Sequence, residues 1–143
     1  MDEPAFELLQ DDDPCQALEA ALVEHLYAFN VEATGHADGR LIGGRMLDVD
    51  GALLAGFSGH TGGGVSVLTH LWVASVHRAR GLGRELLARA EAEALRRGCA
   101  EAIVLTHDFQ APAFYERTGY RCVASIPGWP AGHANHVYRK TLR

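Results

Sequence analysis

The chain has 143 residues, the size of one domain and long enough to bury a single hydrophobic core. Apolar residues make up 48% of it and charged residues 22%, which is ordinary for a globular protein, and no stretch approaches the roughly 20 apolar residues of a membrane span. Thirteen basic and 18 acidic residues give a net charge of −5, which argues against a general nucleic-acid-binding surface.

The N-terminus and the cysteines indicate a cytoplasmic protein. The sequence begins MDEPAFELLQDDD, which is acidic and lacks the basic start and apolar run of a signal peptide. Cys15, Cys99 and Cys122 are odd in number and widely scattered, without C-x-x-C spacing, so we expect reduced thiols.

The first part of the chain is expected to hold a short strand, a helix and a polar segment. Residues Ala5–Gln10 could form the strand, and Asp11-Asp12-Asp13-Pro14 is a typical helix start. Apolar residues at spacings of three and four predict that this helix runs to about Asn30. The segment Asn30–Gly39 is expected to contain a second short helix or a mobile loop.

A hairpin and a central strand follow. The strands Arg40–Val49 and Ala52–His60 are joined by Asp50-Gly51, a strong turn signal. Gly62–Gly64 forms the next turn and leads into the central strand, Val65–Ala74. Glycines inside the hairpin strands predict bulges or close approach of a ligand, at Gly43, Gly44, Gly56 and Gly59.

A strand–helix–strand unit is predicted next. An amphipathic helix from about Leu82 to Arg97 ends at Gly98, and the short apolar run Ala102–Thr106 is typical of a strand buried in a parallel pairing. The stretch from Leu71 to Thr106 therefore reads as a right-handed βαβ crossover.

The turn Arg78–Gly83 predicts a pyrophosphate site. Its two glycines let backbone N–H groups face a ligand, and the positive end of the following helix dipole points there. Arg78, Arg80 and Arg84 add positive charge around it. A nucleotide P-loop would need Lys-Ser or Lys-Thr after the second glycine, where Arg84-Glu85 stands, and a dinucleotide fingerprint would need a glycine at Leu86. The alternative is an ordinary arginine-rich connection.

The last third is expected to contain a short helix and two strands. Asp108 suits the N-cap of a helix that carries Phe114 and Tyr115 and stops at Gly119. The strands Tyr120–Ser125 and Asn135–Leu142 enclose a loop, Pro127–His133, with an exposed Trp129.

Two motifs resemble landmarks of the GNAT (Gcn5-related N-acetyltransferase) superfamily. The R-x-x-G-x-G pattern of residues 78–83 resembles its coenzyme A loop, and Ala111–Tyr120 resembles its second landmark, A-x-x-F/L-Y-x-x-x-G-F/Y. The expected order of elements is also similar over nearly the whole chain. The resemblance implies an α/β (α+β) fold: a mixed, strongly bent β-sheet of six to seven strands flanked by helices on both faces, in a single domain over residues 1–143.

By this resemblance the protein is an N-acetyltransferase that transfers an acetyl group from acetyl-CoA directly to a primary amine of a small molecule or peptide. Backbone amides around Arg80–Arg84 would hold the pyrophosphate, and the backbone of Val73 would run beside the pantetheine arm. The cofactor-binding residues implied are Leu71, Trp72, Val73, Arg78, Ala79, Arg80, Gly81, Leu82, Gly83, Arg84, Asp108 and Phe114.

The same resemblance makes Tyr115 the general acid that protonates the departing thiolate, the alternative being a core aromatic. His70, His107 and His133 are candidates for the general base, because the pKa of histidine suits that role, and we favour His70 and His133; a structural role is the alternative for each. Many family members have asparagine where Asp108 stands, so this residue is either a plain helix cap or a carboxylate that helps to bind or deprotonate the amine.

Two other functions stay open: transfer of a different acyl group, and a catalytically silent CoA-binding or regulatory domain. The expected partner is a small-molecule or peptide amine, with no nucleic acid or membrane, and family members commonly form homodimers. His133-x-x-His136 lacks the context of a zinc site, so no metal is expected. Substrate contacts are expected from the segments Asn30–Gly39, Gly59–Gly64 and Trp129–His133.

Overall fold

The computed structural model describes residues 3–143, which divide into two compact units, one ending at Ala37 and one spanning Asp38–Arg143. The first unit contains α1 (Asp12–Thr34), which begins after an extended Asp11 and ends at Gly35, a left-handed residue whose N–H donates to the carbonyl of Val31. The predicted strand over residues 5–10 is wrong: these residues are irregular, since no neighbouring strand pairs with their backbone. The helix also continues beyond Asn30, so the first half of the expected loop is helical.

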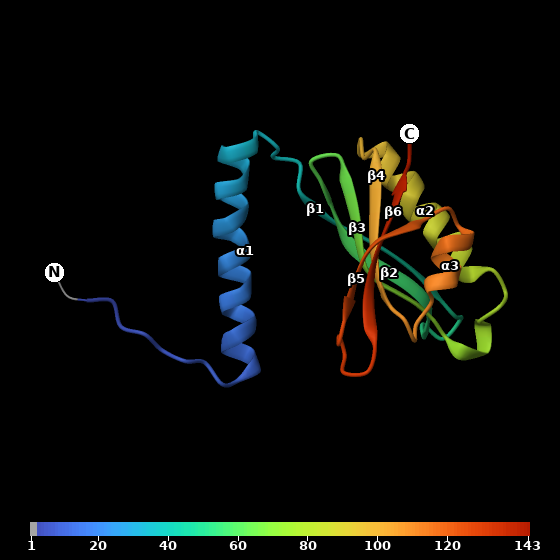
Figure 1. Cartoon of the computed structure of the whole chain (residues 1–143), viewed down its shortest axis with the longest axis horizontal. Coiled ribbons are helices and arrows are strands. Elements are labelled where there is room, and N and C mark those ends of the chain that lie inside the picture. Colours follow the sequence, from blue (N-terminus) through green and yellow to red (C-terminus); the bar gives the residue numbers. More distant parts are fainter. Residues whose placement is uncertain (1–2) are drawn as a thin grey trace. The chain divides into compact units, whose positions relative to one another are not determined.

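The second unit is built on a six-stranded mixed sheet with the order β1-β2-β3-β4-β6-β5 (Figure 1). Neighbouring strands are antiparallel except for the parallel pair β3 and β4, as the βαβ prediction requires. The strands are β1 (Arg40–Leu47), β2 (Leu53–Gly62), β3 (Val65–Val73), β4 (Glu101–His107), β5 (Arg121–Pro127) and β6 (Ala134–Thr141).

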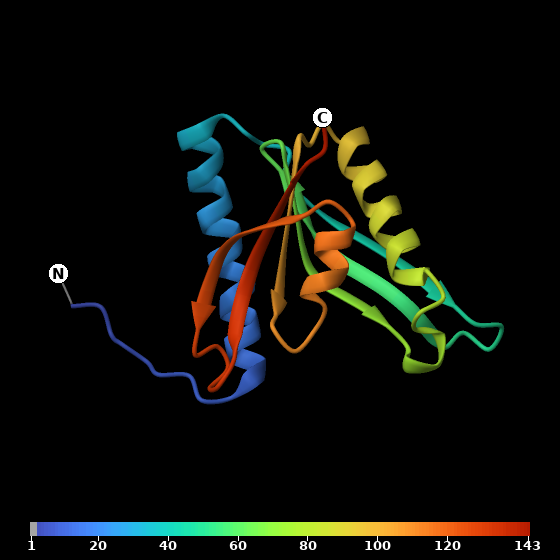
Figure 2. The same ribbon diagram turned by 45° about the vertical axis from the view of Figure 1, so that its right-hand side comes forward.

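Two α-helices of this unit share one core with the sheet. The helix α2 (Leu82–Arg96) lies against β1, β2 and β3, and α3 (Pro112–Arg117) lies beside β5 (Figure 2). Buried side chains of both helices, Leu87 and Ala90 of α2 and Tyr115 of α3, belong to one cluster with those of the strands. The core consists of Ile42, Leu68, Leu87, Ala90, Ala102, Val104, Tyr115, Tyr120 and Tyr138.

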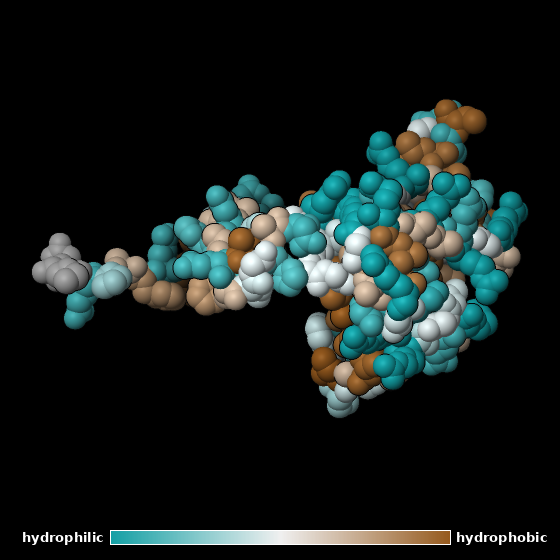
Figure 3. All heavy atoms as spheres, turned by 90° about the horizontal axis from the view of Figure 1, so that it is seen from above, coloured by the Kyte–Doolittle hydropathy of each residue, from teal (hydrophilic) through white to brown (hydrophobic). Residues whose placement is uncertain are grey.

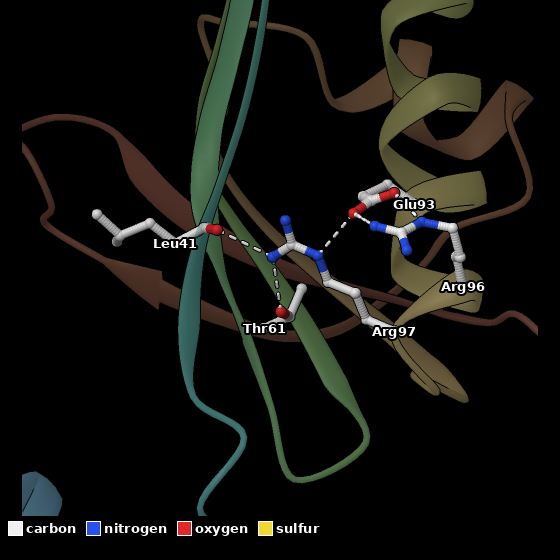
Figure 4. A network of polar contacts seen from close by, with 5 residues as sticks. All are labelled: Leu41, Thr61, Glu93, Arg96 and Arg97. Atoms are coloured by element: carbon white, nitrogen blue, oxygen red, sulfur yellow. Dashed lines mark hydrogen bonds and ion pairs between the residues drawn. The ribbon is translucent and has the colours of Figure 1, made fainter.

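Arg97, just after α2, ties the C-terminal end of this helix to the first two strands (Figure 4). Its guanidinium donates to the carbonyl of Leu41 on β1 at 2.9 Å and to the hydroxyl of Thr61 on β2 at 3.0 Å. It also pairs with Glu93 at 2.9 Å, and Glu93 pairs with Arg96 as well. The Glu93–Arg97 pair is thus part of a clamp between the helix and the sheet.

The two central parallel strands are joined over only part of their length. Their pairing covers Val65–Leu68 of β3 and Glu101–Val104 of β4, and beyond these residues the strands separate. The separation begins at a β-bulge: Ser58 pairs with His70 and Gly59 with Leu68, so Thr69 has no partner on β2.

Gly59 allows this bulge. A Cβ atom on Gly59 would lie 2.0 Å from the carbonyl oxygen of Val67, so no larger residue fits there without moving the backbone. The bulge that the glycines of the hairpin predicted is confirmed at this position. It changes the phase of β3, so that Leu68 and Leu71 both contribute to the core.

The surface is mixed. Hydrophilic residues dominate the face of the second unit seen in Figure 3, and hydrophobic patches are interrupted by them. Within residues 3–143, no helix combines the length and the apolar character needed to cross a bilayer.

Candidate active site

A cavity of about 1040 Å³ occupies the place where β3 and β4 separate. Five consecutive residues of β3, Thr69–Val73, line it, although neighbouring side chains of a strand point to opposite faces. The cavity therefore lies along the edge of β3 that β4 leaves open. Its other walls come from the turn before α2, the end of β4 and the start of α3.

Most of the predicted site residues lie at this cavity. The predicted residues that line it are Leu71, Trp72, Val73, Arg78, Ala79, Gly81, Leu82, Gly83, Arg84, Phe114, Tyr115 and His70. The predicted residues Arg80, His107, Asp108 and His133 are not among its lining residues.

The turn before α2 presents backbone N–H groups, because of its local conformation. Ala79 and Gly81 both have left-handed backbones, with φ of 63° and 81°. The N–H of Glu85 makes the first helical bond, to the carbonyl of Gly81, so the N–H groups of residues 82–84 have no partner within the helix. Such a helix start is suited to bind an anionic group.

Two side chains shape this end of the cavity. Arg78 donates its Nε–H to the carbonyl of Val73 at 3.0 Å, which fixes the turn to the end of β3. A Cβ on Gly83 would lie 3.5 Å from the ring of Phe114 and 3.7 Å from a methyl group of Val73, so glycine lets the helix start pack close to both. The exposed Arg84 adds positive charge.

Tyr115 belongs to the core and to the cavity at once. Only 6% of the residue is exposed, and its ring packs edge-on against Phe114 and Tyr120, with centroids 5.1 and 5.7 Å apart. Burial raises the pKa of its hydroxyl to about 12, so it is neutral at physiological pH. No hydrogen bond links this hydroxyl to any residue in the described part of the chain, so it is free to donate to a ligand.

His70 lies on the wall of the cavity beside the bulge. Its Nδ1 atom is 3.2 Å from the hydroxyl of Ser58 and 3.1 Å from the hydroxyl of Thr69. Sequence reasoning missed Thr69 and Ser58, and the only signal for them was Gly59, which marked a bulge without placing it.

Asp108 does not cap α3, and that prediction is wrong. The N-cap of the helix is Ala111, and Asp108 extends the pairing of β4 with β6: its N–H donates to the carbonyl of Ala134 at 3.0 Å and its Oδ2 accepts the N–H of Ala134 at 3.0 Å. Its Oδ1 lies 2.9 Å from Nδ1 of His133. The carboxylate is thus committed to the β5–β6 loop.

An aromatic cluster adjoins the cavity at this loop. The Phe109 ring lines the cavity, stacks on His107 with centroids 5.2 Å apart and meets His133 edge-on at 4.8 Å. His107 also contacts the carbonyl of Trp129 through Nδ1 at 3.1 Å. Phe109 was not singled out from the sequence, because a single aromatic residue in a loop carries no motif. Among residues 3–143, no group of three or more His, Cys, Asp or Glu side chains could hold a metal ion.

Comparisons with known proteins agree with this geometry. Residues 3–120 match the model of the acetyltransferase (GNAT) family. The chain is 46% identical over 93 residues to the blasticidin-S acetyltransferase of Streptomyces morookaense, covering 64% of this chain and 68% of that protein. It is 32% identical over 116 residues to an acetyltransferase of Agrobacterium fabrum, covering 81% and 85%. An acetyltransferase structure from Bacillus cereus, at 21% identity, shares the fold with a TM-score of 0.75 over 96% of this chain and 97% of that chain.

Proposed function

This chain belongs to the acetyltransferase (GNAT) family, whose members use acetyl-CoA, and on that basis we propose that it transfers the acetyl group of acetyl-CoA to a primary amine of a small molecule. The observation that carries the proposal is the cavity at the open edge of β3, which has the start of α2 on its wall together with Tyr115 and His70. The donor and the acceptor would meet in this cavity, beside Tyr115 and His70.

The donor would lie along the open edge of β3. The pyrophosphate would accept hydrogen bonds from the N–H groups of Leu82, Gly83 and Arg84, with the guanidinium groups of Arg78 and Arg84 nearby. The pantetheine arm would run beside the backbone of residues 69–73, which β4 leaves unpaired. Arg80 and Asp108, which do not line the cavity, would contribute less to donor binding.

The reaction forms one bond and breaks another. The amine nitrogen attacks the thioester carbon, the C–N bond forms, the C–S bond breaks, and the amine loses a proton. Sulfur leaves as a thiolate, which the neutral hydroxyl of Tyr115 would stabilise by donating a hydrogen bond and which a proton finally neutralises. The raised pKa of Tyr115 keeps this donor available throughout the neutral range.

The similarity to a blasticidin-S acetyltransferase favours a small-molecule acceptor over a protein. The aromatic rings of Trp72 and Phe109 on the cavity wall, 48% and 55% exposed, could stack on a flat or cationic acceptor. Transfer of another acyl group and a silent CoA-binding role are the alternatives, and a homodimer and a cytoplasmic location remain part of the proposal.

The proposal is tested by calorimetric titration with acetyl-CoA, followed by thiol release on the same sample with blasticidin S, an aminoglycoside, a polyamine and a short peptide. We expect binding, and turnover with at least one small amine. Binding without turnover on a broader panel would support the silent domain, turnover on the peptide alone would overturn the acceptor class, and absence of binding would contradict the whole proposal.

A matched pair of variants assigns the anion site. Arg84→Gln should weaken CoA binding by about tenfold, the size of one charge-assisted hydrogen bond, while Arg89→Gln on the same helix should not. Arg89 is the proper control because it pairs with Glu85 and does not line the cavity.

A further inference from the structure

The hydroxyl group of Thr69 has one hydrogen and two neighbours that could receive it. Its oxygen lies 3.1 Å from the carbonyl oxygen of Ser58, which can only accept, and 3.1 Å from Nδ1 of His70, which can accept or donate. Because the carbonyl cannot donate, both contacts are hydrogen bonds at the same time only if Thr69 gives its hydrogen to the carbonyl and Nδ1 carries a hydrogen that it donates to Thr69.

Ser58 is compatible with the same protonation pattern, because its hydroxyl can accept as well as donate. Its hydroxyl oxygen lies 3.2 Å from Nδ1 of His70, so a hydrogen on Nδ1 points towards two hydroxyl oxygens. In the neutral ring the second nitrogen, Nε2, then has a free lone pair. Nε2 has no hydrogen-bond partner among residues 3–143, and the ring stands on the wall of the cavity.

The bulge is what makes this arrangement possible. Side chains of consecutive residues in a regular strand point to opposite faces, so Thr69 and His70 could not be in contact there. The unpaired Thr69 interrupts the alternation and brings its hydroxyl to the imidazole, and Gly59 provides the space for the bulge. The other favoured candidate, His133, has its Nδ1 on Asp108 and does not line the cavity.

We propose that Thr69 and Ser58 are positioning residues that hold His70 in the Nδ1–H form, so that Nε2 is the general base for the acceptor amine. This inference rests on the proposed acetyl transfer. Nε2 takes a proton from the amine nitrogen as the C–N bond forms, which gives an imidazolium whose Nδ1–H still donates to the two hydroxyls. The C–S bond breaks, the thiolate leaves against the hydroxyl of Tyr115, and the imidazolium returns its proton to water.

The first test reads the tautomer and needs no substrate. Long-range ¹H–¹⁵N NMR of the imidazole, at a pH where His70 is neutral, distinguishes the Nδ1–H form from the Nε2–H form that free histidine side chains favour. We expect Nδ1–H in the wild type and in Thr69→Ser, and a shift towards Nε2–H in Thr69→Val. Ser58→Ala, which leaves the bulge residue in place, should produce a smaller shift in the same direction. A wild type in the Nε2–H form would overturn the inference.

The second test uses an acceptor found by the thiol-release panel. His70→Ala should lower kcat by roughly 100-fold, and added imidazole should restore part of the rate, which a structural role would not allow. Thr69→Val should lower kcat without changing KM for acetyl-CoA, and Thr69→Ser should keep the wild-type rate. A wild-type rate in His70→Ala, or a loss that imidazole does not restore, would overturn the base role. If no amine is acetylated by the wild type, the proposed function fails, and the NMR result still decides the positioning of His70 separately.

Discussion

The two halves of β3 differ in what surrounds them. In the first half, Val65–Leu68 pair with strands on both sides, and Leu68 is 4% exposed in the core. In the second half, Thr69–Val73 have β2 on one side and the cavity on the other, and Trp72 is 48% exposed. One strand therefore contributes to stability at its start and to the candidate active site at its end.

This difference indicates that the candidate active site exists because β3 and β4 stop pairing. A sheet in which β3 and β4 stayed paired along their whole length would satisfy its own backbone groups and leave no room for the cavity. The bulge at Thr69 marks the change, and the lack of a side chain on Gly59 permits it. The comparison predicts that substitutions in the paired half lower stability, and that substitutions in the open half lower activity.

The largest expected effect on stability comes from filling the space at Gly59. The Cβ of Gly59→Ala would meet the carbonyl oxygen of Val67, which cannot rotate away as a side chain could, so we expect a loss of about 3 kcal/mol in the free energy of unfolding. Gly43→Ala is the control, because its Cβ would lie 3.5 Å from the nearest atom, the carbonyl oxygen of Phe57. Urea unfolding measures both, and equal midpoints would refute the role of Gly59.

Tyr115→Phe should separate activity from stability. The hydroxyl bonds to no described residue, so its removal should change the free energy of unfolding by less than about 0.5 kcal/mol. The rate constant kcat should fall roughly 100-fold, since the departing sulfur loses its donor. Because burial raises the pKa of Tyr115 to about 12, the difference between the two proteins should persist up to about pH 10. A full rate in the variant would assign Tyr115 to the core alone.

Two neighbouring residues of β4 test where the paired part of the sheet ends and the cavity begins. Val104 is 1% exposed and is the last residue paired with β3, whereas Leu105 is 38% exposed and lines the cavity. We expect Val104→Ala to cost about 2 kcal/mol of stability. Leu105→Ala should cost less than about 1 kcal/mol and should raise KM for acetyl-CoA. Urea unfolding and steady-state kinetics on the same samples compare the two variants. A larger loss of stability in Leu105→Ala than in Val104→Ala would place the end of the paired region elsewhere.

The sequence predicted the parts of the fold that local chemistry determines. The Asp50-Gly51 turn, the glycine turn before α2 and the apolar β4 each carry their own signal, and the structure confirms the elements that they predict. The family resemblance added their spatial order. The predicted CoA residues also converge on one cavity, apart from Arg80 and Asp108.

The features that the sequence did not predict correctly depend on partners that are distant in the chain. Residues 5–10 have the composition of a strand, but no neighbouring strand pairs with them. Asp108 has the chemistry of a helix cap, but its carboxylate is taken by the backbone of Ala134 on another strand. The position of the bulge depends on how β2 and β3 align, so Gly59 predicted a bulge but not the contact of Thr69 with His70.

The smallest expected effect concerns the end of the sheet at which β3 and β4 are paired. There Arg97 and Glu93 join α2 to β1 and β2. Hydrogen bonds from Arg96 and then Arg97 lower the pKa of Glu93 from 4.5 to about 2. A carboxylate whose pKa is lower in the folded state stabilises the protein above the unfolded value, and this contribution is lost as the pH falls through about 2. Glu93→Gln should therefore flatten the decline of stability between about pH 4.5 and 2, and high salt should reduce the difference, since the Arg96 side chain is exposed.

Urea unfolding at pH 7 and at pH 3 measures this change, with Glu85→Gln as the control. Glu85 pairs with Arg89 at 3.0 Å on the surface of the same helix, and within residues 3–143 neither side chain bonds to the sheet. Arg97, by contrast, holds Leu41 and Thr61 through bonds that survive the loss of Glu93, so Glu93→Gln should weaken the clamp without opening it. An equal pH dependence in the two variants would mean that Glu93 acts as an ordinary surface charge and that the paired end is held by its apolar core alone.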